Sequence, residues 1–339
     1  MHDAIKALHS IETKSLTKSF GDVIAVNDVS FSVESGEIFG FLGPNGAGKS
    51  TTMMILTTLL KPTSGKALIS GFDVSANPKK VRENIGYVQQ ETTVDEYLTG
   101  RENLLLQAKL NHIPKNEINV RIDAVLELIE LSDKQHDSVV TYSGGMRKRL
   151  DIAGGLLHRP KVLFLDEPTV GLDIQTRRKI WKYLKKIHDE FEMTIFLTTH
   201  YMEEADQLCD RVGIIDGGKI QVIDSPKNMK NAMGNEVISI LLEDGASQDS
   251  FLSELRKLEF VNKINVDGTK LTLFASNGTE VIPKIFQISS TLKIKITSIA
   301  LTQPTLDDVF LSYTGHEIRD DDSKFNRKRE HAKMKGLRA

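Results

Sequence analysis

A glycine-rich stretch near the N-terminus contains the residue types that bind phosphate groups. Glycines let a backbone pass close to a phosphate because they carry no Cβ atom. The lysine of such a loop contacts β- and γ-phosphates, and the hydroxyl that follows it ligates Mg²⁺. The stretch matches the pattern G-x-x-x-x-G-K-[S/T] without a mismatch, and its residues are Gly43, Pro44, Asn45, Gly46, Ala47, Gly48, Lys49, Ser50 and Thr51. The sequence therefore predicts a site for a nucleoside triphosphate.

The flanking segments favour this interpretation over a simple glycine-rich turn. Residues 36–42 form a short apolar strand pattern, and residues 52–60 form a helical pattern that ends before Lys61-Pro62. A loop that opens into a helix N-terminus presents unpaired N–H groups and the positive end of the helix dipole to an anion. Both features are what a phosphate-binding loop requires.

Two further apolar strands end in ionisable side chains. Residues 161–165 run into Asp166 and Glu167, and residues 194–199 run into His200. Continuous apolar strands are typical of parallel sheets, in which ligands lie at the carboxyl ends of the strands. Asp166 is therefore expected to organise Mg²⁺. The alternatives are a solvated acidic turn and a structural histidine.

Two other positions could contact a nucleotide. Ser143 can cap the helix that follows it, so Ser143-Gly144-Gly145 is a second helix N-terminus suited to anions, or an ordinary cap. Phe20, at a turn, could stack on adenine or serve only in packing. Gln90 ends the strand pattern of residues 85–90, ahead of a mostly helical region from about 99 to 157.

The composition of the chain excludes several classes of protein. With 40% hydrophobic and 27% charged residues and a net charge of −2, the chain resembles a soluble globular protein with no overall basic excess for nucleic acid. Its one cysteine, Cys209, excludes an internal disulfide and is expected to be a packed thiol. No run of about 18 apolar residues could span a bilayer, and residues 1–6 do not form a secretory signal.

The motifs together resemble the ATP-binding subunit of an ABC transporter. The resemblance covers about residues 10–225 and includes residues 43–51, Gln90, Ser143-Gly144-Gly145, Asp166-Glu167, Gly171-Leu172-Asp173 and His200 in the order of the family. Residues 142–150 resemble the daunorubicin-resistance type of exporter subunit, part of the ABC-2 group. Tyr142 and Met146 replace the ends of the commoner Leu-Ser-Gly-Gly-Gln signature, while its Ser-Gly-Gly centre is present.

The resemblance implies a role for each residue of the site. Lys49 and the loop amides would hold the phosphates of ATP, and Ser50, Asp166 and Gln90 would organise Mg²⁺. Glu167 would polarise the attacking water, and His200 would contact the γ-phosphate. Phe20 would stack on adenine, and Ser143-Gly144-Gly145 would reach the ATP that a second copy of the chain holds.

The resemblance also implies partners and a location. Two subunits would sandwich ATP head to tail, and hydrolysis would release them and drive transport through a separate ABC-2-type transmembrane permease. The chain would then be cytoplasmic and peripheral on the inner face of the cell membrane. No nucleic-acid partner is expected.

The predicted fold is α/β. A mainly parallel sheet of the P-loop NTPase type would carry an antiparallel β subdomain and a helical subdomain at about residues 91–157, within an ATPase domain of residues 1–233. Residues 234–315 show the order βαββαβ, which predicts a small α+β, ferredoxin-like accessory domain.

The last residues, 316–339, are polar and end in a basic run. The default prediction is a disordered tail, and weak contact with an anionic membrane surface is a hypothesis.

Two other functions compete with the exporter subunit. One is a soluble ABC ATPase that acts on ribosomes or nucleic acid, although such proteins usually carry two ATPase units or a long coiled coil, which this chain lacks. The other is a nucleotide-binding module without turnover, against which the presence of Lys49, Asp166 and Glu167 argues.

Overall fold

The computed structural model describes residues 9–234, 236–243 and 248–315. The chain forms two compact units, and the second begins at Asp224, whereas the sequence predicts the boundary at 233/234. The difference arises because helix α8 (Pro226–Met233) contacts helix α11 (Leu306–Thr314) of the second unit. The predicted basic tail at 316–339 lies outside the described residues.

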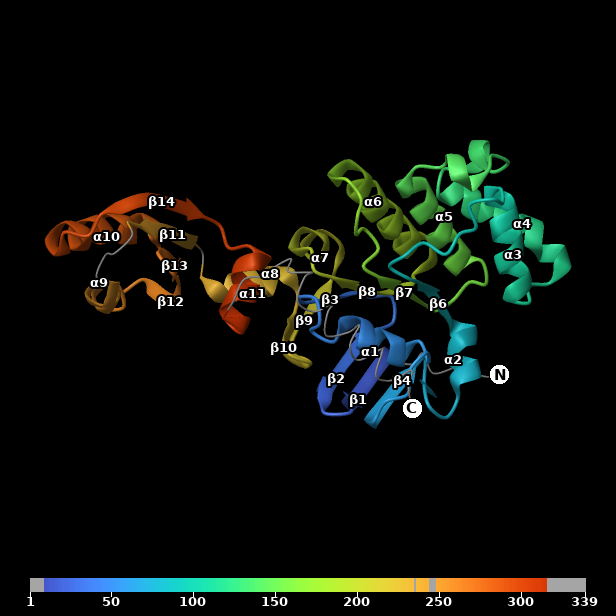
Figure 1. Cartoon of the computed structure of the whole chain (residues 1–339), viewed down its shortest axis with the longest axis horizontal. Coiled ribbons are helices and arrows are strands. Elements are labelled where there is room, and N and C mark those ends of the chain that lie inside the picture. Colours follow the sequence, from blue (N-terminus) through green and yellow to red (C-terminus); the bar gives the residue numbers. More distant parts are fainter. Residues whose placement is uncertain (1–8, 235, 244–247, 316–339) are drawn as a thin grey trace. The chain divides into compact units, whose positions relative to one another are not determined.

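A six-stranded sheet forms the centre of the first unit (Figure 1). Strands β6, β7, β8, β3 and β9 are parallel, so the carboxyl ends of β3, β7 and β8 lie at one edge. The strands are, in sheet order, β10 (Lys219–Asp224), β9 (Arg211–Asp216), β3 (Ile38–Leu42), β8 (Thr194–Thr199), β7 (Val162–Asp166) and β6 (Ile85–Val88). Every residue of β3, β7 and β8 is buried, which explains their continuous apolar sequences.

A second, antiparallel sheet of the first unit contains four strands. They are, in sheet order, β2 (Val23–Glu34), β1 (His9–Phe20), β4 (Ser64–Ile69) and β5 (Phe72–Asp73). Strand β2 is continuous between Val26 and Val29. It accommodates Asp28 with a φ of 56° and a shift in its register with β1.

Aromatic rings join the two sheets of the first unit. Phe31 of β2 stacks on Phe39 of β3 with ring centroids 5.5 Å apart, and on Phe196 of β8 at 5.9 Å. Pairs of this kind contribute about 0.5–1.5 kcal/mol each beyond the area that they bury. Phe31 thus packs β2 against the strands that lead to His200 and to the phosphate-binding loop.

Helices surround this core. Helices α3, α4 and α5 contact one another and form the predicted helical region (Figure 1). A capping box at Thr99 begins α3, and the Ser143 hydroxyl accepts from the Met146 N–H to begin α5. The helices of the unit are α1 (Lys49–Leu56), α2 (Pro78–Asn84), α3 (Gly100–Leu110), α4 (Lys115–Leu128), α5 (Gly144–Leu156), α6 (Ile174–Phe191) and α7 (Met202–Leu208), with short 3-10 turns at Ser132–Lys134 and Val139–Thr141. Cys209, at the end of α7, is buried, as expected for a packed thiol.

In the described part of the second unit there are a four-stranded antiparallel sheet and four helices. The sheet order β12-β13-β11-β14 is that of a ferredoxin-like fold, so this prediction is confirmed. Side chains of α9 and α10 pack on the apolar face of the sheet. The elements besides α8 and α11 are β11 (Glu236–Leu242), α9 (Gln248–Leu255), β12 (Val261–Asp267), β13 (Lys270–Ala275), α10 (Gly278–Leu292) and β14 (Ile296–Thr302).

Candidate functional site: a phosphate loop beside two carboxylates

The loop between β3 and α1 requires glycine at defined positions. The φ of Gly48 is +103°, and a Cβ atom there would lie 2.4 Å from the Ala25 carbonyl oxygen. A Cβ atom on Gly43 would lie 2.2 Å from the Ile215 carbonyl oxygen. Strands β2 and β9 therefore enclose the loop so closely that its path is fixed. A rigid loop that ends at a helix N-terminus is suited to binding phosphate.

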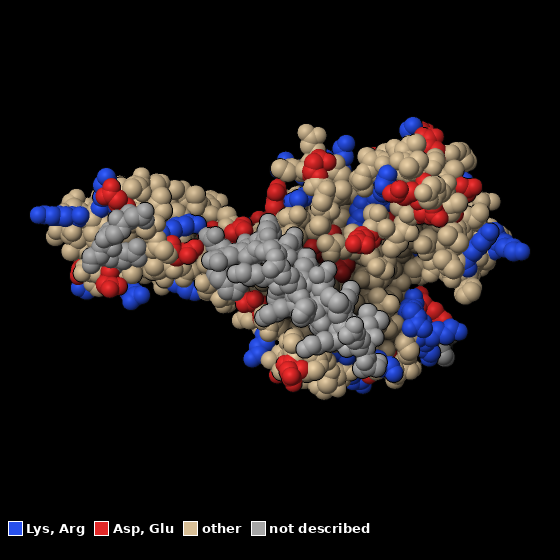
Figure 2. Space-filling model, in the orientation of Figure 1, with Lys and Arg blue, Asp and Glu red and all other residues tan. Residues whose placement is uncertain are grey.

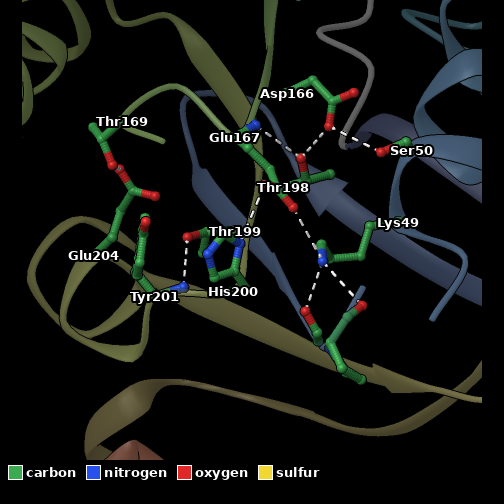
Figure 3. Close-up of polar contacts among 12 residues, drawn as sticks. Lys49, Ser50, Asp166, Glu167, Thr169, Thr198, Thr199, His200, Tyr201 and Glu204 are labelled. Carbon is green, nitrogen blue, oxygen red and sulfur yellow. Dashed lines mark hydrogen bonds and ion pairs between the residues drawn. The ribbon is translucent and has the colours of Figure 1, made fainter. Parts of the chain in front are cut away.

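Lys49, the first residue of α1, is buried at the mouth of this loop. Its Nζ atom donates to the carbonyl oxygens of Gly43 (2.6 Å) and Pro44 (3.1 Å) and lies 3.2 Å from Oε1 of Glu167 (Figure 3). Burial lowers the pKa of Lys49, and the negative charges of Glu167 and Asp166 oppose that shift. The ammonium is thus held between the loop and the end of β7.

Asp166 and Ser50 form an oxygen-rich pair. The Ser50 hydroxyl donates to Oδ1 of Asp166 at 3.3 Å, and the Thr198 hydroxyl donates to the same oxygen at 2.5 Å. Burial raises the pKa of Asp166, and these two hydrogen bonds oppose that shift. Hydroxyl and carboxylate oxygens are the donors that Mg²⁺ prefers, together with phosphate oxygens. Among the described residues no group of three or more His, Cys, Asp or Glu could hold a metal ion.

Glu167 lies between two basic side chains (Figure 3). Its Oε1 faces Lys49, and its Oε2 lies 3.1 Å from Nδ1 of His200. Burial alone would raise the pKa of Glu167, but the contacts with His200 and Lys49 outweigh it and lower the pKa. The carboxylate therefore stays ionised near neutral pH, as a proton acceptor must. Its φ of 44° turns the chain sharply at the end of β7.

Thr198 is a residue of the site that the sequence analysis missed. Its hydroxyl donates to Asp166 and accepts from the backbone N–H of Glu167 at 3.1 Å. One hydroxyl of β8 thus contacts the carboxylate of Asp166 and the backbone of Glu167. The available signal was the pair Thr198-Thr199, which follows the apolar residues 195–197 at the end of the strand.

Glu204, also missed, supports the segment that follows Glu167. This completely buried side chain accepts from the Thr169 hydroxyl (2.8 Å) and from the indole N–H of Trp181 (3.0 Å) through Oε1. It thereby joins α7 to α6 and to the turn after β7. Burial raises the pKa of Glu204, and its hydrogen bonds oppose that shift.

We expect the Glu204→Gln variant to lose part of the pH dependence of stability. The pKa of Glu204 is higher in the folded than in the unfolded protein. The contribution of Glu204 to the free energy of unfolding is therefore largest at a pH below the unfolded-state pKa, and it falls as pH rises through the folded-state pKa. Glutamine does not titrate, so the thermal midpoint of the variant should rise relative to wild type by on the order of a few °C between about pH 5 and pH 8. The exposed neighbour variant Glu203→Gln should follow wild type. If the thermal midpoints of Glu204→Gln and wild type differ by the same amount at about pH 5 and at about pH 8, the prediction is contradicted.

Five predicted residues lie together: Lys49, Ser50, Asp166, Glu167 and His200. Among the described contacts, none joins Phe20, Gln90 or Ser143 to this group. Phe20 is 49% exposed, with Nζ of Lys18 5.0 Å from its ring centroid. Gln90 is exposed, and its backbone carbonyl accepts from Lys148 at 3.2 Å.

The residues of the signature segment, 142–146, differ in their exposure to solvent. Ser143 and Gly144 are exposed, whereas a Cβ atom on the buried Gly145 would lie 2.4 Å from a side-chain carbon of Thr176 in α6. Tyr142 is also buried, and its hydroxyl donates to the Lys134 carbonyl at 2.5 Å. The departure from the commoner signature at Tyr142 therefore lies inside the protein and leaves the exposed centre of the motif unchanged.

The fold and the site define the chain as a P-loop nucleoside triphosphatase, and comparisons with known proteins narrow this class. Residues 26–170 match the ABC transporter family, and residues 225–314 match the C-terminal domain of ATP-binding proteins like DrrA1-3. The linearmycin resistance ATP-binding protein LnrL of Bacillus subtilis is 35% identical, covering 91% of this chain and 100% of that protein. The daunorubicin/doxorubicin resistance ATP-binding protein DrrA of Streptomyces peucetius is 37% identical, and the match covers 92% of this chain and 94% of that protein.

Solved structures agree with this result. The cbiO1 protein of Clostridium perfringens, part of the cbiONQ ABC transporter complex, has a TM-score of 0.62 and 29% identity, covering 66% of this chain and 93% of that one. The dimeric post-hydrolysis ATP-binding cassette MJ0796, bound to ADP and phosphate, has a TM-score of 0.57 and 28% identity. The match covers 63% of this chain and 98% of that one.

The chain therefore belongs to the ATP-binding proteins of ABC transporters, in the group with a DrrA-like C-terminal domain. It binds ATP, and its first unit is an ABC-type ATPase. The predicted family and the predicted α/β fold are both confirmed.

Proposed function

We propose that this chain is the ATP-hydrolysing subunit of an ABC-2-type exporter and works with a separate transmembrane permease. The observation that carries the proposal is the buried contact of Glu167 with both Lys49 and His200, beside the Ser50–Asp166 pair. The names of the relatives, which are resistance ATP-binding proteins, support export of a toxic compound. Within 9–234, 236–243 and 248–315, every helix is too short or too polar to span a bilayer. The transport pathway is therefore assigned to the permease.

The site residues have distinct roles in this proposal. Lys49 and the amides of residues 43–51 bind the phosphates, while Ser50, Asp166 and Gln90 hold Mg²⁺. When bound, Mg²⁺ neutralises negative charge on the phosphates. The Glu167 carboxylate accepts a proton from the attacking water, and His200 contacts the γ-phosphate. The lowered pKa of Glu167 supports its role, because a carboxylate must be ionised to accept that proton.

We further propose that two copies of the chain sandwich ATP at the cytoplasmic face of the membrane. Exposure of Ser143 and Gly144 at the N-terminus of α5 supports a contact with the nucleotide that the second copy holds. Phe20, half exposed at the end of β1, is suited to stacking on adenine. The MJ0796 structure, a dimer bound to ADP and phosphate, supports the assembly of two copies.

Acidic and basic side chains are interspersed over the coloured part of the face that Figure 2 displays. A binding site for a phosphate backbone is instead a surface on which Lys and Arg side chains cluster.

Co-purification tests the proposed function. Tagged Glu167→Gln protein is isolated from its native membranes with ATP and Mg²⁺, which should retain the ATP-bound dimer, and its partners are identified. A multi-span membrane protein is the expected partner. Ribosomal or nucleic-acid components in its place would contradict the exporter function, although not the ATPase activity.

A further inference from the structure

Helix α5 holds the segment Gln89–Thr93 with two buried side chains. Lys148 is 3% exposed, and its Nζ atom donates to the carbonyl oxygens of Gln89 at 2.6 Å and Gln90 at 3.2 Å. Asp151 is 8% exposed, and its Oδ1 accepts from the hydroxyl of Thr93 at 2.7 Å and from its N–H at 3.3 Å. The first and last residues of the segment are thus bound to one helix.

The two side chains act from one face of α5. Lys148 and Asp151 are three residues apart, and residues at this spacing are neighbours on a helix surface. Burial lowers the pKa of Lys148 and raises that of Asp151, and each group opposes the shift of the other. A buried charge is costly unless it is paired and hydrogen-bonded. Their contacts with the segment satisfy part of that requirement.

Packing holds the segment much less than these bonds do. Residues 89–93 are all exposed and belong to no helix or strand. Thr93 also borders a cavity of about 180 Å³, lined by side chains that include Tyr87, Asn103 and His158. Because the segment has open space on this side and solvent on others, its position depends on its hydrogen bonds to α5.

We propose that Lys148 and Asp151 are positioning residues that clamp the segment carrying Gln90 to α5, the helix whose N-terminus presents Ser143 and Gly144. The inference rests on the proposed function, in which Gln90 holds Mg²⁺ in one site and Ser143 contacts the nucleotide of the other. The clamp thereby fixes the position from which Gln90 reaches the Mg²⁺ site.

The test compares Lys148→Met, Asp151→Ala and the double variant with wild-type protein. Methionine keeps most of the length of Lys148 without its donor, and alanine removes the Asp151 acceptor. Lys148→Arg and Asp151→Asn, which retain the donor and the acceptor, are expected to restore function in part. Lys109→Met, an exposed substitution on α3, is the matched control.

Two measurements are made on each full-length protein. Amide hydrogen exchange over residues 89–93 should become about tenfold faster when either partner of the clamp is removed. The Mg²⁺ concentration that half-saturates ATP hydrolysis should rise by about tenfold, whereas ATP binding without Mg²⁺ stays within about twofold of wild type. The double variant should lose less than the sum of the two single effects, because both side chains hold one segment.

Equal exchange of residues 89–93 in Lys148→Met and wild-type protein would overturn the clamp. If the Mg²⁺ concentration that half-saturates ATP hydrolysis is unchanged in these variants, the link between the clamp and Gln90 is overturned. Absence of ATP hydrolysis in wild-type protein would instead contradict the proposed function, and the exchange rates would still decide whether the clamp exists.

Discussion

Replacement of Glu167 by glutamine is expected to lower kcat for ATP hydrolysis by about 10²–10⁴-fold, the usual contribution of a general base. Glutamine has nearly the same size as Glu167 but accepts no proton from water. Nε2 of glutamine would face Lys49 or His200, which lie 3.2 and 3.1 Å from the native carboxylate oxygens. ATP binding should persist, since Lys49 and the loop are unchanged. Steady-state hydrolysis and equilibrium binding of labelled ATP measure the two effects separately.

The same variant should accumulate as an ATP-bound dimer. Size-exclusion chromatography with light scattering, in the presence of ATP and Mg²⁺, should show twice the monomer mass for Glu167→Gln and mainly monomer for wild type. Glu203→Gln, the same substitution at an exposed position of α7, is the control and should hydrolyse ATP normally. Retention of wild-type kcat in Glu167→Gln would refute the assignment of Glu167 as the base.

Replacement of Lys49 by methionine should weaken ATP binding by about 10- to 100-fold and abolish detectable hydrolysis. Hydrogen bonds to a charged group contribute about 1.5–3 kcal/mol, and each 1.4 kcal/mol corresponds to a tenfold change in affinity. Lys49 also compensates the buried charge of Glu167, so its loss should raise the pKa of that carboxyl. Isothermal titration with ATP measures the affinity.

Lys61→Met, an exposed substitution after α1, is the control and should bind ATP as wild type does. Circular dichroism of Lys49→Met establishes that the variant is folded, because two carbonyl groups of the loop lose their donor. Unchanged affinity in a folded Lys49→Met protein would exclude the loop as the nucleotide site.

The sequence was informative where residues close in the chain perform the chemistry. The loop at 43–51, the apolar strands that end at Asp166 and Thr199, and the cap at Ser143 could each be predicted from local patterns. The βαββαβ order of the second unit followed from periodicity in the same way.

Contacts between distant residues could not be predicted in this manner. Thr198 lies 32 positions from Asp166, and Glu204 lies 35 positions from Thr169, so only the packing of β8 and α7 reveals these pairs. The boundary between the units depended on α8, whose sequence does not reveal that it contacts α11. The role of Lys148 was hidden for a further reason, since a lysine after a helix cap is ordinarily solvated.

The inward position of Tyr142 limits what the signature motif communicates to a partner. A second copy of the chain can meet Ser143 and Gly144, but it cannot meet an aromatic ring buried against the Lys134 turn. Variation at position 142 is therefore governed by the interior of the helical region and not by nucleotide chemistry. For protein engineering, this means that Tyr142 and its surrounding side chains should be exchanged together as one packing unit, whereas the proposed contact with a nucleotide is what constrains Ser143 and Gly144.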